Sequence, residues 1–97
     1  MGLLQWLRLA GLTYTMWFVY VLKSIEHPFI YIGSTHNLEA RLKSHNEGLN
    51  QSTKHCAPYK IEAYVAVSTE AKARELEKYF KTGSGKALLK KRILVEE

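Results

Sequence analysis

Residues 17–46, which read WFVYVLKSIEHPFIYIGSTHNLEARLKSHN, decide the fold of this chain. The run from Trp17 to Lys23 is aromatic and β-branched, a composition typical of a buried strand. Phe29 to Gly33 is a second run of the same kind, and the residues between the two runs, Ser24 to Pro28, are typical of a turn. Because only this short turn separates the runs, the sequence predicts a β-hairpin.

A helix and a third strand are expected after the hairpin. Asn37 is placed to cap a helix that runs to about His45 or Asn46, where Gly48 would stop it. Residues 59–67 then alternate with a period of two, which predicts a strand with one wetter side. The residues expected on its shared face are Tyr59, Ile61, Ala63, Val65 and Val67.

Two further helices follow the third strand. Thr69 is placed to cap a helix from Glu70 to Lys81, which the glycine-rich turn at residues 82–85 would end. The next helix, from about Lys86 to Leu94, is expected to have an apolar side made of Leu88, Leu89 and Ile93. The order β-β-α-β-α-α predicts an α/β fold of the α+β type, in which helices flank a small, three-stranded, mainly antiparallel sheet.

Length and composition indicate one small domain. The chain has 97 residues, of which 46% are hydrophobic and 11% aromatic, enough for one compact core. Its single cysteine, Cys56, cannot form an internal disulfide, which excludes a disulfide-stapled secreted domain and predicts a reducing compartment, the cytoplasm. Four widely spaced histidines and one cysteine also lack the closely spaced ligand pairs of structural zinc sites.

The first 22 residues have two interpretations. Leu3 to Leu22 is apolar apart from Arg8 and is long enough to span a bilayer, so a membrane-tethered protein is one alternative. Arg8 would lie inside that span, and the segment GLTYT at residues 11–15 interrupts it. We therefore interpret residues 1–15 as an N-terminal extension and residues 16–97 as the domain, with no stable membrane association expected.

The positive charge of the chain is concentrated near its C-terminus. The net charge is +5, and the segment from Lys72 to Arg92 holds eight basic residues against only Glu75 and Glu77. A localised basic surface is typical of a protein that binds a polyanion such as a nucleic acid. The alternative is a helix face whose charges only interact with water.

Polar residues interrupt two predicted apolar stripes. Ala73, Leu76 and Phe80 form the buried stripe of the Glu70–Lys81 helix, and the helical period places Glu77 on the same stripe. In the preceding helix, Arg41 and His45 are four residues apart and are expected to project together beside the buried side. Buried ionisable groups are costly unless they are paired or have a function. Each could be structural, with Glu77 a plain ion-pair partner and His45 a core residue.

Taken together, these side chains could support metal-assisted phosphodiester hydrolysis. One carboxylate can hold a hard divalent cation whose remaining ligands are waters, and one arginine can bind a phosphate through two hydrogen bonds. A tyrosine or a histidine can orient or deprotonate a water molecule, and the two predicted hairpin strands carry Tyr20 and Tyr31. Strand tyrosines are also common core residues, so this pair alone does not decide the function.

From Trp17 to about Leu94 the chain resembles the GIY-YIG nuclease superfamily, and in particular its small, stand-alone, single-domain members. The first half-motif is Val19-Tyr20-Val21, a variant of its consensus, and the second is the literal Tyr31-Ile32-Gly33. The rest of the ordered series comprises Ser34-Thr35, Asn37-Leu38, Arg41-Leu42, His45-Asn46 and the segment EKYFKTGSG at residues 77–85.

This resemblance implies a metal-dependent endonuclease that hydrolyses phosphodiester bonds in DNA. Tyr20 and Tyr31 would flank the scissile phosphate, and either could be the general base. Arg41 would hold the phosphate, and His45 would relay a proton or fix a tyrosine hydroxyl. Glu77 would be the protein ligand of Mg²⁺ or Mn²⁺. Gly33 would let the backbone approach the site closely.

The expected partner is DNA, structured or single-stranded, and RNA is not excluded. Exposed basic residues are expected to bind its backbone, namely Lys54, Lys81, Lys86, Lys90, Lys91 and Arg92. The alternative function is a binding module that keeps the fold and the basic face but does not cut. The complete set of predicted active-site residues argues against that alternative, because a decayed site would be expected to have lost at least one.

Overall fold

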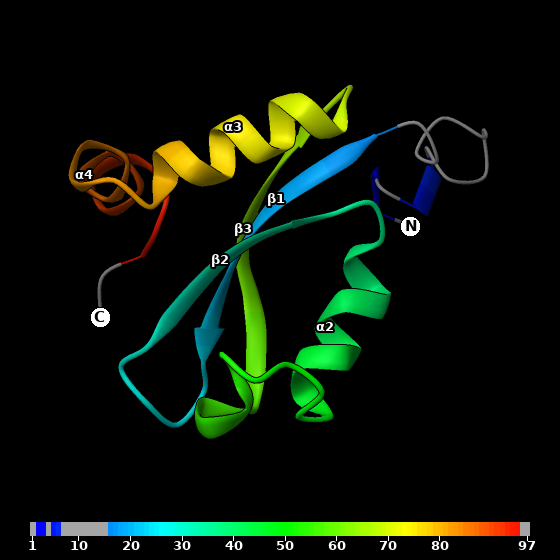
Figure 1. Cartoon of the computed structure of the whole chain (residues 1–97), viewed down its shortest axis with the longest axis vertical. Helices are drawn as coiled ribbons and strands as arrows, with labels where there is room; N and C mark the ends of the chain where they lie inside the picture. The colour runs from blue at the N-terminus through cyan, green and yellow to red at the C-terminus, as the bar shows by residue number, and fades with distance from the viewer. Residues whose placement is uncertain (1, 4, 7–15, 96–97) are drawn as a thin grey trace.

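The computed structural model describes residues 2–3, 5–6 and 16–95 and contains a three-stranded sheet with helices on both faces (Figure 1). The strands are β1 (Trp17–Ser24), β2 (Ile30–Thr35) and β3 (Tyr59–Val67), arranged in the order β2-β1-β3 with both pairings antiparallel. The predicted α+β fold and its element order are therefore confirmed.

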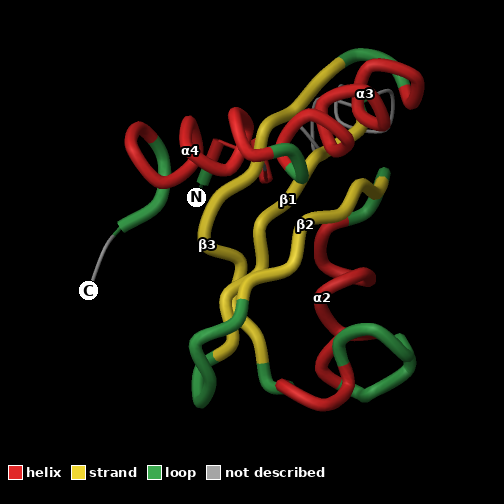
Figure 2. The backbone as a smooth tube through the Cα atoms, turned by 60° about the vertical axis from the view of Figure 1, so that its left-hand side comes forward, coloured by secondary structure: helices red, strands yellow, loops and turns green. Residues whose placement is uncertain are grey.

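Helix α2 (Leu38–Asn46) covers one face of the sheet, and α3 (Glu70–Phe80) and α4 (Gly83–Arg92) cover the other (Figures 1 and 2). The alternation of β1 creates a separate hydrophobic core on each face. The α2 core consists of Phe18, Tyr20, Leu22, Leu38, Cys56 and Tyr59. The α3–α4 core consists of Val19, Val21, Ile32, Ala73, Phe80 and Leu89.

The β1–β2 hairpin places both half-motifs side by side. Tyr20 lies opposite Gly33, and Leu22 lies opposite Tyr31, so all four residues belong to the face that α2 covers. Ser34 lies opposite Val19 and belongs to the other face. Side chains of β2 alternate between the two faces of the sheet. Because β2 is also an edge strand, the two faces adjoin each other along its unpaired side.

The prediction that Tyr59, Ile61, Ala63, Val65 and Val67 share one face of β3 is wrong. The pairing between β1 and β3 is irregular at Val21/Leu22, where Leu22 pairs with Ile61 and Val21 pairs with Ala63. This bulge changes the alternation. Tyr59 and Ile61 consequently pack in the α2 core, whereas Val65 and Val67 pack in the α3–α4 core.

Helix α2 begins and ends as its sequence predicts. The Asn37 side chain accepts a hydrogen bond from the backbone N–H of Ala40, and Gly48 follows the helix with a φ of 75°. At the far end, the Asn46 amide donates to the Tyr59 carbonyl at 3.1 Å and accepts from the Tyr59 N–H at 2.6 Å. These two bonds fasten the C-terminal end of α2 to the start of β3.

Thr69 caps α3 as expected, but α4 begins three residues before its predicted start. The Thr82 hydroxyl accepts a hydrogen bond from the Gly85 N–H, so residues 83–85 form the first turn of α4. Gly85 is required for packing, because a Cβ atom there would collide with the Tyr79 carbonyl group. The predicted apolar side is only partly correct: Leu89 is buried, whereas Leu88 and Ile93 are 39% and 38% exposed.

Most of the predicted N-terminal extension lies outside the described residues, so the boundary at residue 16 stays a prediction. Within the described part of the chain, no helix has the length and hydrophobicity needed to cross a membrane.

Candidate active site

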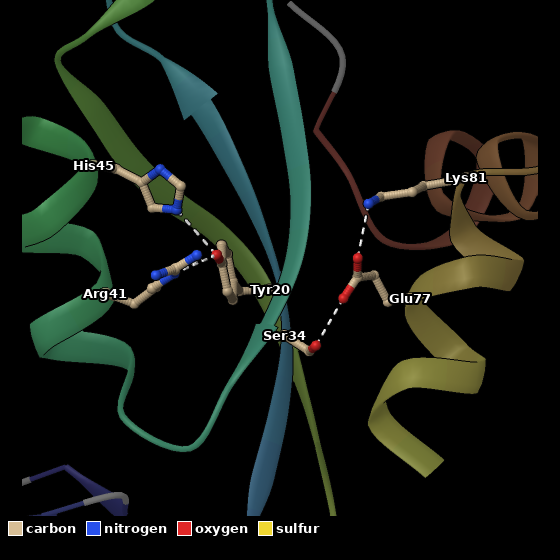
Figure 3. A network of polar contacts seen from close by, with 6 residues as sticks. All are labelled: Tyr20, Ser34, Arg41, His45, Glu77 and Lys81. Atoms are coloured by element: carbon tan, nitrogen blue, oxygen red, sulfur yellow. Dashed lines mark hydrogen bonds and ion pairs between the residues drawn. The ribbon is translucent and has the colours of Figure 1, made fainter. Parts of the chain in front are cut away.

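The hydroxyl of Tyr20 is the meeting point of the residues on the α2 face (Figure 3). Its oxygen lies 3.0 Å from His45 Nε2 and accepts a longer hydrogen bond, 3.4 Å, from Arg41 Nε. The i, i+4 spacing on α2 makes Arg41 and His45 project together, as the sequence predicts, and the packing of α2 on the sheet brings both to the same phenol. Tyr20 itself is 1% exposed, so β1 holds this hydroxyl rigidly within the α2 core.

Burial and charge act in opposite directions on Tyr20. Burial raises the pKa of its hydroxyl above the ordinary value, and the hydrogen bond and positive charge of Arg41 oppose that rise without cancelling it. The phenol therefore keeps its proton at neutral pH. To act as a base, it needs an acceptor for that proton.

His45 is such an acceptor. Its side chain is fully buried, and burial followed by repulsion from Arg41 lowers its pKa. The imidazole is consequently neutral at pH 7, with one nitrogen available to accept a proton. Its second nitrogen, Nδ1, lies 2.7 Å from the hydroxyl of Thr53, in the loop between α2 and β3.

Tyr31 lies beside this group on the edge strand. Its ring is half-buried and stands 5.2 Å from the His45 ring and 6.4 Å from the Tyr20 ring, measured between centroids. Both tyrosines therefore belong to one cluster. Only Tyr20, however, has a hydrogen bond that links its hydroxyl to His45 among the described residues.

Gly33 provides the space in which the Tyr20 hydroxyl lies. A Cβ atom at this position would collide with the hydroxyl oxygen and would stand 2.6 Å from the ring carbon that carries it. A ring carbon of Tyr31 would be only 3.1 Å away. Glycine is needed here because of this close approach.

Glu77 lies on the opposite face of β2 (Figure 3). Its Oε1 accepts a 2.7 Å hydrogen bond from the Ser34 hydroxyl, and its Oε2 accepts one of the same length from Lys81 Nζ. Burial raises the pKa of this carboxyl, but the bonds from Lys81 and Ser34 outweigh that effect, so its pKa is lowered overall. Glu75, on the same helix, is 69% exposed and forms an ion pair with Lys72.

Lys81 connects the two halves of the site around the edge of the sheet. Its ammonium group pairs with Glu77 and also stands 5.7 Å from the centroid of the Tyr31 ring. The half containing Tyr20, Arg41 and His45 and the half containing Glu77 lie on either side of β2 (Figure 3), which is an edge strand. Such an edge is open to an extended ligand.

Glu77 has the donor chemistry of a divalent-metal ligand. It is ionised, and among the described residues each of its oxygens makes one hydrogen bond, so each keeps a lone pair for a cation. The described residues contain no group of three or more His, Cys, Asp or Glu side chains arranged to hold a metal. A cation at Glu77 would complete its shell with water and with substrate oxygens, an arrangement that suits Mg²⁺ or Mn²⁺.

The predicted nucleic-acid-binding residues are all exposed, but they do not form one surface. Lys81 lies in the site itself, and α4 carries four more of them. Lys54 begins the short 3₁₀ helix η2 (Lys54–Cys56), which packs through Cys56 against the α2 core. It therefore lies on the opposite side of the sheet from α4 (Figure 1).

Sequence reasoning missed Thr53 as a site residue and quoted Ser34 only as part of the motif. Thr53 lies in a polar loop whose sequence carries no signal of burial, yet it is fully buried. Ser34 could have been found from strand alternation, because it is the polar residue after Gly33 that falls on the same face as the predicted Glu77 stripe.

We expect Gly33→Ala to displace the Tyr20 ring and to destabilise the fold by about 1–3 kcal/mol, the usual cost of adding a methyl group to a packed core. Chemical denaturation would measure the loss. Gly83→Ala is the matched control, because a Cβ atom there has nothing within 4 Å. Equal stability of the two variants would contradict the role given to Gly33.

Comparison with known proteins identifies the family. The GIY-YIG catalytic domain matches residues 16–92. The UPF0213 protein of Bacillus licheniformis is 39% identical over 70 residues, which is 71% of each chain. No solved structure gives a significant match. The extent of the domain match and the identity to this relative show that the chain belongs to the GIY-YIG family, whose catalytic domain is that of a nuclease.

Proposed function

We propose that this protein is a divalent-metal-dependent endonuclease that hydrolyses phosphodiester bonds in DNA. The observation that carries the proposal is the shared Tyr20 hydroxyl, held by Arg41 and His45 across the edge strand from an ionised Glu77. A purely structural core would have no need of an arginine, a histidine and a tyrosine converging on one buried oxygen.

In the proposed site, Arg41 binds the scissile phosphate. Its Nε contacts Tyr20, so the other guanidinium nitrogens are directed to phosphate oxygens. Tyr31, half-buried at the edge, orients the attacking water. Glu77 holds Mg²⁺ or Mn²⁺, which when bound stabilises the negative charge that develops on the phosphate.

The proposed reaction moves one proton inward along the buried hydrogen bond between Tyr20 and His45. Tyr20 passes its proton to His45 Nε2 and takes one from the water. The water oxygen then forms a bond to phosphorus while the bond to the leaving-strand oxygen breaks, and that oxygen takes up a proton from solvent. His45 returns its proton to Tyr20, which releases its own to solvent, so both residues regain their starting states. Tyr20 cannot deprotonate the water unaided, because burial raises its pKa. The neutral imidazole of His45 accepts the proton, and Arg41 stabilises the phenolate that forms through its hydrogen bond and its charge.

DNA is the proposed partner, in structured or single-stranded form, with RNA as the competing nucleic acid. The family assignment supports a nucleic-acid substrate. The exposed basic residues of α4 lie beyond α3, on the face that carries Glu77 (Figure 1). We also propose a cytoplasmic location, because the single cysteine of the chain is buried and reduced.

The test is a cleavage assay on branched, flapped, single-stranded and double-stranded DNA and on matching RNA, with Mg²⁺, with Mn²⁺ and with EDTA. We expect cleavage of at least one DNA substrate that EDTA abolishes. Metal-independent binding without cleavage of any substrate would favour the alternative, a binding module with the same fold.

Binding is expected to be mainly electrostatic and to depend on α4. The logarithm of the affinity should fall linearly with the logarithm of the salt concentration, by about 0.9 per phosphate neutralised on duplex DNA. Replacing Lys90, Lys91 and Arg92 with alanine should weaken binding and reduce that slope by about three units at most. Fluorescence anisotropy across a salt series measures both quantities.

Lys60→Ala is the control for this experiment, because Lys60 is exposed on β3 and outside α4. It should leave the slope unchanged. An unchanged slope in the α4 variant would place the nucleic acid on another face, and Lys54→Ala would then test the α2 side.

A further inference from the structure

The buried hydrogen-bond chain does not end at His45. Thr53 is fully buried, and its Oγ1 lies 2.7 Å from His45 Nδ1 on the side of the ring that faces away from Tyr20. We propose that Thr53 is a positioning residue that holds His45 in the Nδ1–H tautomer, so that the Nε2 lone pair faces the Tyr20 hydroxyl. Its consequence for catalysis rests on the proposed function, but the tautomer itself does not.

The direction in which protons are donated along these hydrogen bonds follows from Arg41. Its guanidinium donates to the Tyr20 oxygen, and the positive end of the Tyr20 O–H dipole is driven away from that cation. Within the described residues, the acceptor that remains for this proton is His45 Nε2, at 3.0 Å. A neutral imidazole carries one proton, so a ring that accepts at Nε2 must carry its proton on Nδ1 and donate it to Thr53.

The opposite direction is less favourable. If His45 donated from Nε2, the Tyr20 oxygen would face two N–H donors and its own buried proton would have no protein acceptor among the described residues. In the proposed direction the bonds run the same way from Arg41 through Tyr20 and His45 to Thr53, whose hydroxyl is the last member of the series. Hydrogen bonds aligned in this way strengthen one another.

Thr53 is itself held from three sides. Its backbone N–H donates to the Asn50 carbonyl at 3.2 Å, and its carbonyl accepts from the Tyr59 hydroxyl at 2.6 Å and from the Cys56 N–H at 3.2 Å. The Tyr59 backbone is in turn clamped by Asn46 at the end of α2. The loop therefore presents the Thr53 hydroxyl to His45 at a fixed place relative to α2.

This arrangement gives His45 a defined role. The nitrogen that faces Tyr20 is free to accept a proton, and when it does, Thr53 continues to accept from Nδ1 and fixes the ring while it is charged. Thr53 touches neither the proposed substrate nor the reacting atoms. It acts through His45 alone, as outer partners of catalytic and metal-binding histidines commonly do.

The test is the tautomer of His45, measured from two-bond proton–nitrogen couplings in ¹⁵N-labelled full-length protein at neutral pH, with His45→Gln used to assign its signals. We expect the unmodified protein to show the Nδ1–H form, with Nε2 unprotonated. Thr53→Val, which keeps the shape but removes the hydroxyl, should lose this single tautomer. Thr53→Ser should retain it.

The same variants are then compared in the cleavage assay. Thr53→Val is expected to reduce cleavage by about 10- to 100-fold, the usual effect of losing such an outer partner, and Thr53→Ser should restore it. An Nε2–H tautomer in the unmodified protein would overturn the proposal, and so would an unchanged tautomer in Thr53→Val. The first measurement does not depend on any Thr53 variant, so an Nε2–H tautomer would overturn the proposal even if Thr53→Val failed to fold.

Failure of the proposed function gives a different pattern. In that case the unmodified protein cleaves no substrate under any metal condition, while the tautomer and its dependence on Thr53 stay measurable. The two ideas can therefore fail separately.

Discussion

Glu77→Gln is expected to reduce DNA cleavage by at least about 100-fold while DNA binding stays near normal. The change keeps the size and hydrogen-bonding capacity of the side chain but removes the negative charge that a hard cation needs. A bound metal typically contributes several kcal/mol to transition-state stabilisation, which is a rate factor of about 100 or more. Cleavage across a Mg²⁺ and Mn²⁺ titration, binding in EDTA and Mn²⁺ binding by calorimetry would measure the effect.

Two control variants separate a metal ligand from an ion-pair partner. Glu75→Gln removes an exposed pair with Lys72 on the same helix and should change nothing. Lys81→Met removes the partner of Glu77 but leaves its carboxylate in place. If Glu77 were only an ion-pair partner, Lys81→Met and Glu77→Gln would behave alike, with stability changes within about 1 kcal/mol and no selective loss of cleavage.

Tyr20→Phe is the second substitution expected to have a large effect on cleavage. The ring packing in the α2 core is kept, whereas the oxygen shared by Arg41 and His45 is lost. We expect cleavage to fall by about 100-fold or more, the contribution of a general acid–base group. In the proposed relay the reactive state has a protonated Tyr20 and a neutral His45, so the rate of the unmodified protein should rise with pH through the lowered pKa of His45 and be level around neutral pH. Tyr20→Phe should lose this rise.

Tyr31→Phe is the decisive comparison, because the sequence leaves open which tyrosine is the base. With Tyr20 as the base, Tyr31→Phe should lose less activity and keep the rise with pH. Tyr64→Phe, at a position 46% exposed on β3, is the neutral control. If Tyr31→Phe abolished the pH dependence and Tyr20→Phe did not, the buried hydrogen bonds of Tyr20 would be structural and Tyr31 would be the base.

Local rules predicted most of the fold correctly. The hairpin follows from two strand-like runs around a short turn, and Asn37 and Thr69 cap α2 and α3 where the sequence places them. These features depend on neighbouring residues, so they can be read along the chain. The start of α4 was misplaced because Thr82 and the glycines after it resemble a helix end, whereas Gly85 serves the close contact with Tyr79.

The bulge in β3 has no local signal. Its sequence alternates regularly, but pairing with β1 inserts an extra residue between Ile61 and Ala63 and turns the second half of the strand to the other face. The first half of β3 then packs in the core under α2, and the second half packs in the core under α3 and α4. A register of this kind is set by the partner strand and by the two layers of helices.

For the site, the sequence by itself identified Tyr20, Arg41 and His45 on predicted elements and Glu77 on an apolar stripe, because a polar residue at a core position is visible in the periodicity. Only the tertiary structure showed that these groups lie on two faces of one edge strand, with Lys81 joining them around that edge. It alone brought Thr53 to His45 and Ser34 to Glu77. The physical reason is distance along the chain: periodicity reports which face of its own element a residue occupies, whereas hydrogen bonds between elements depend on how the sheet and helices pack.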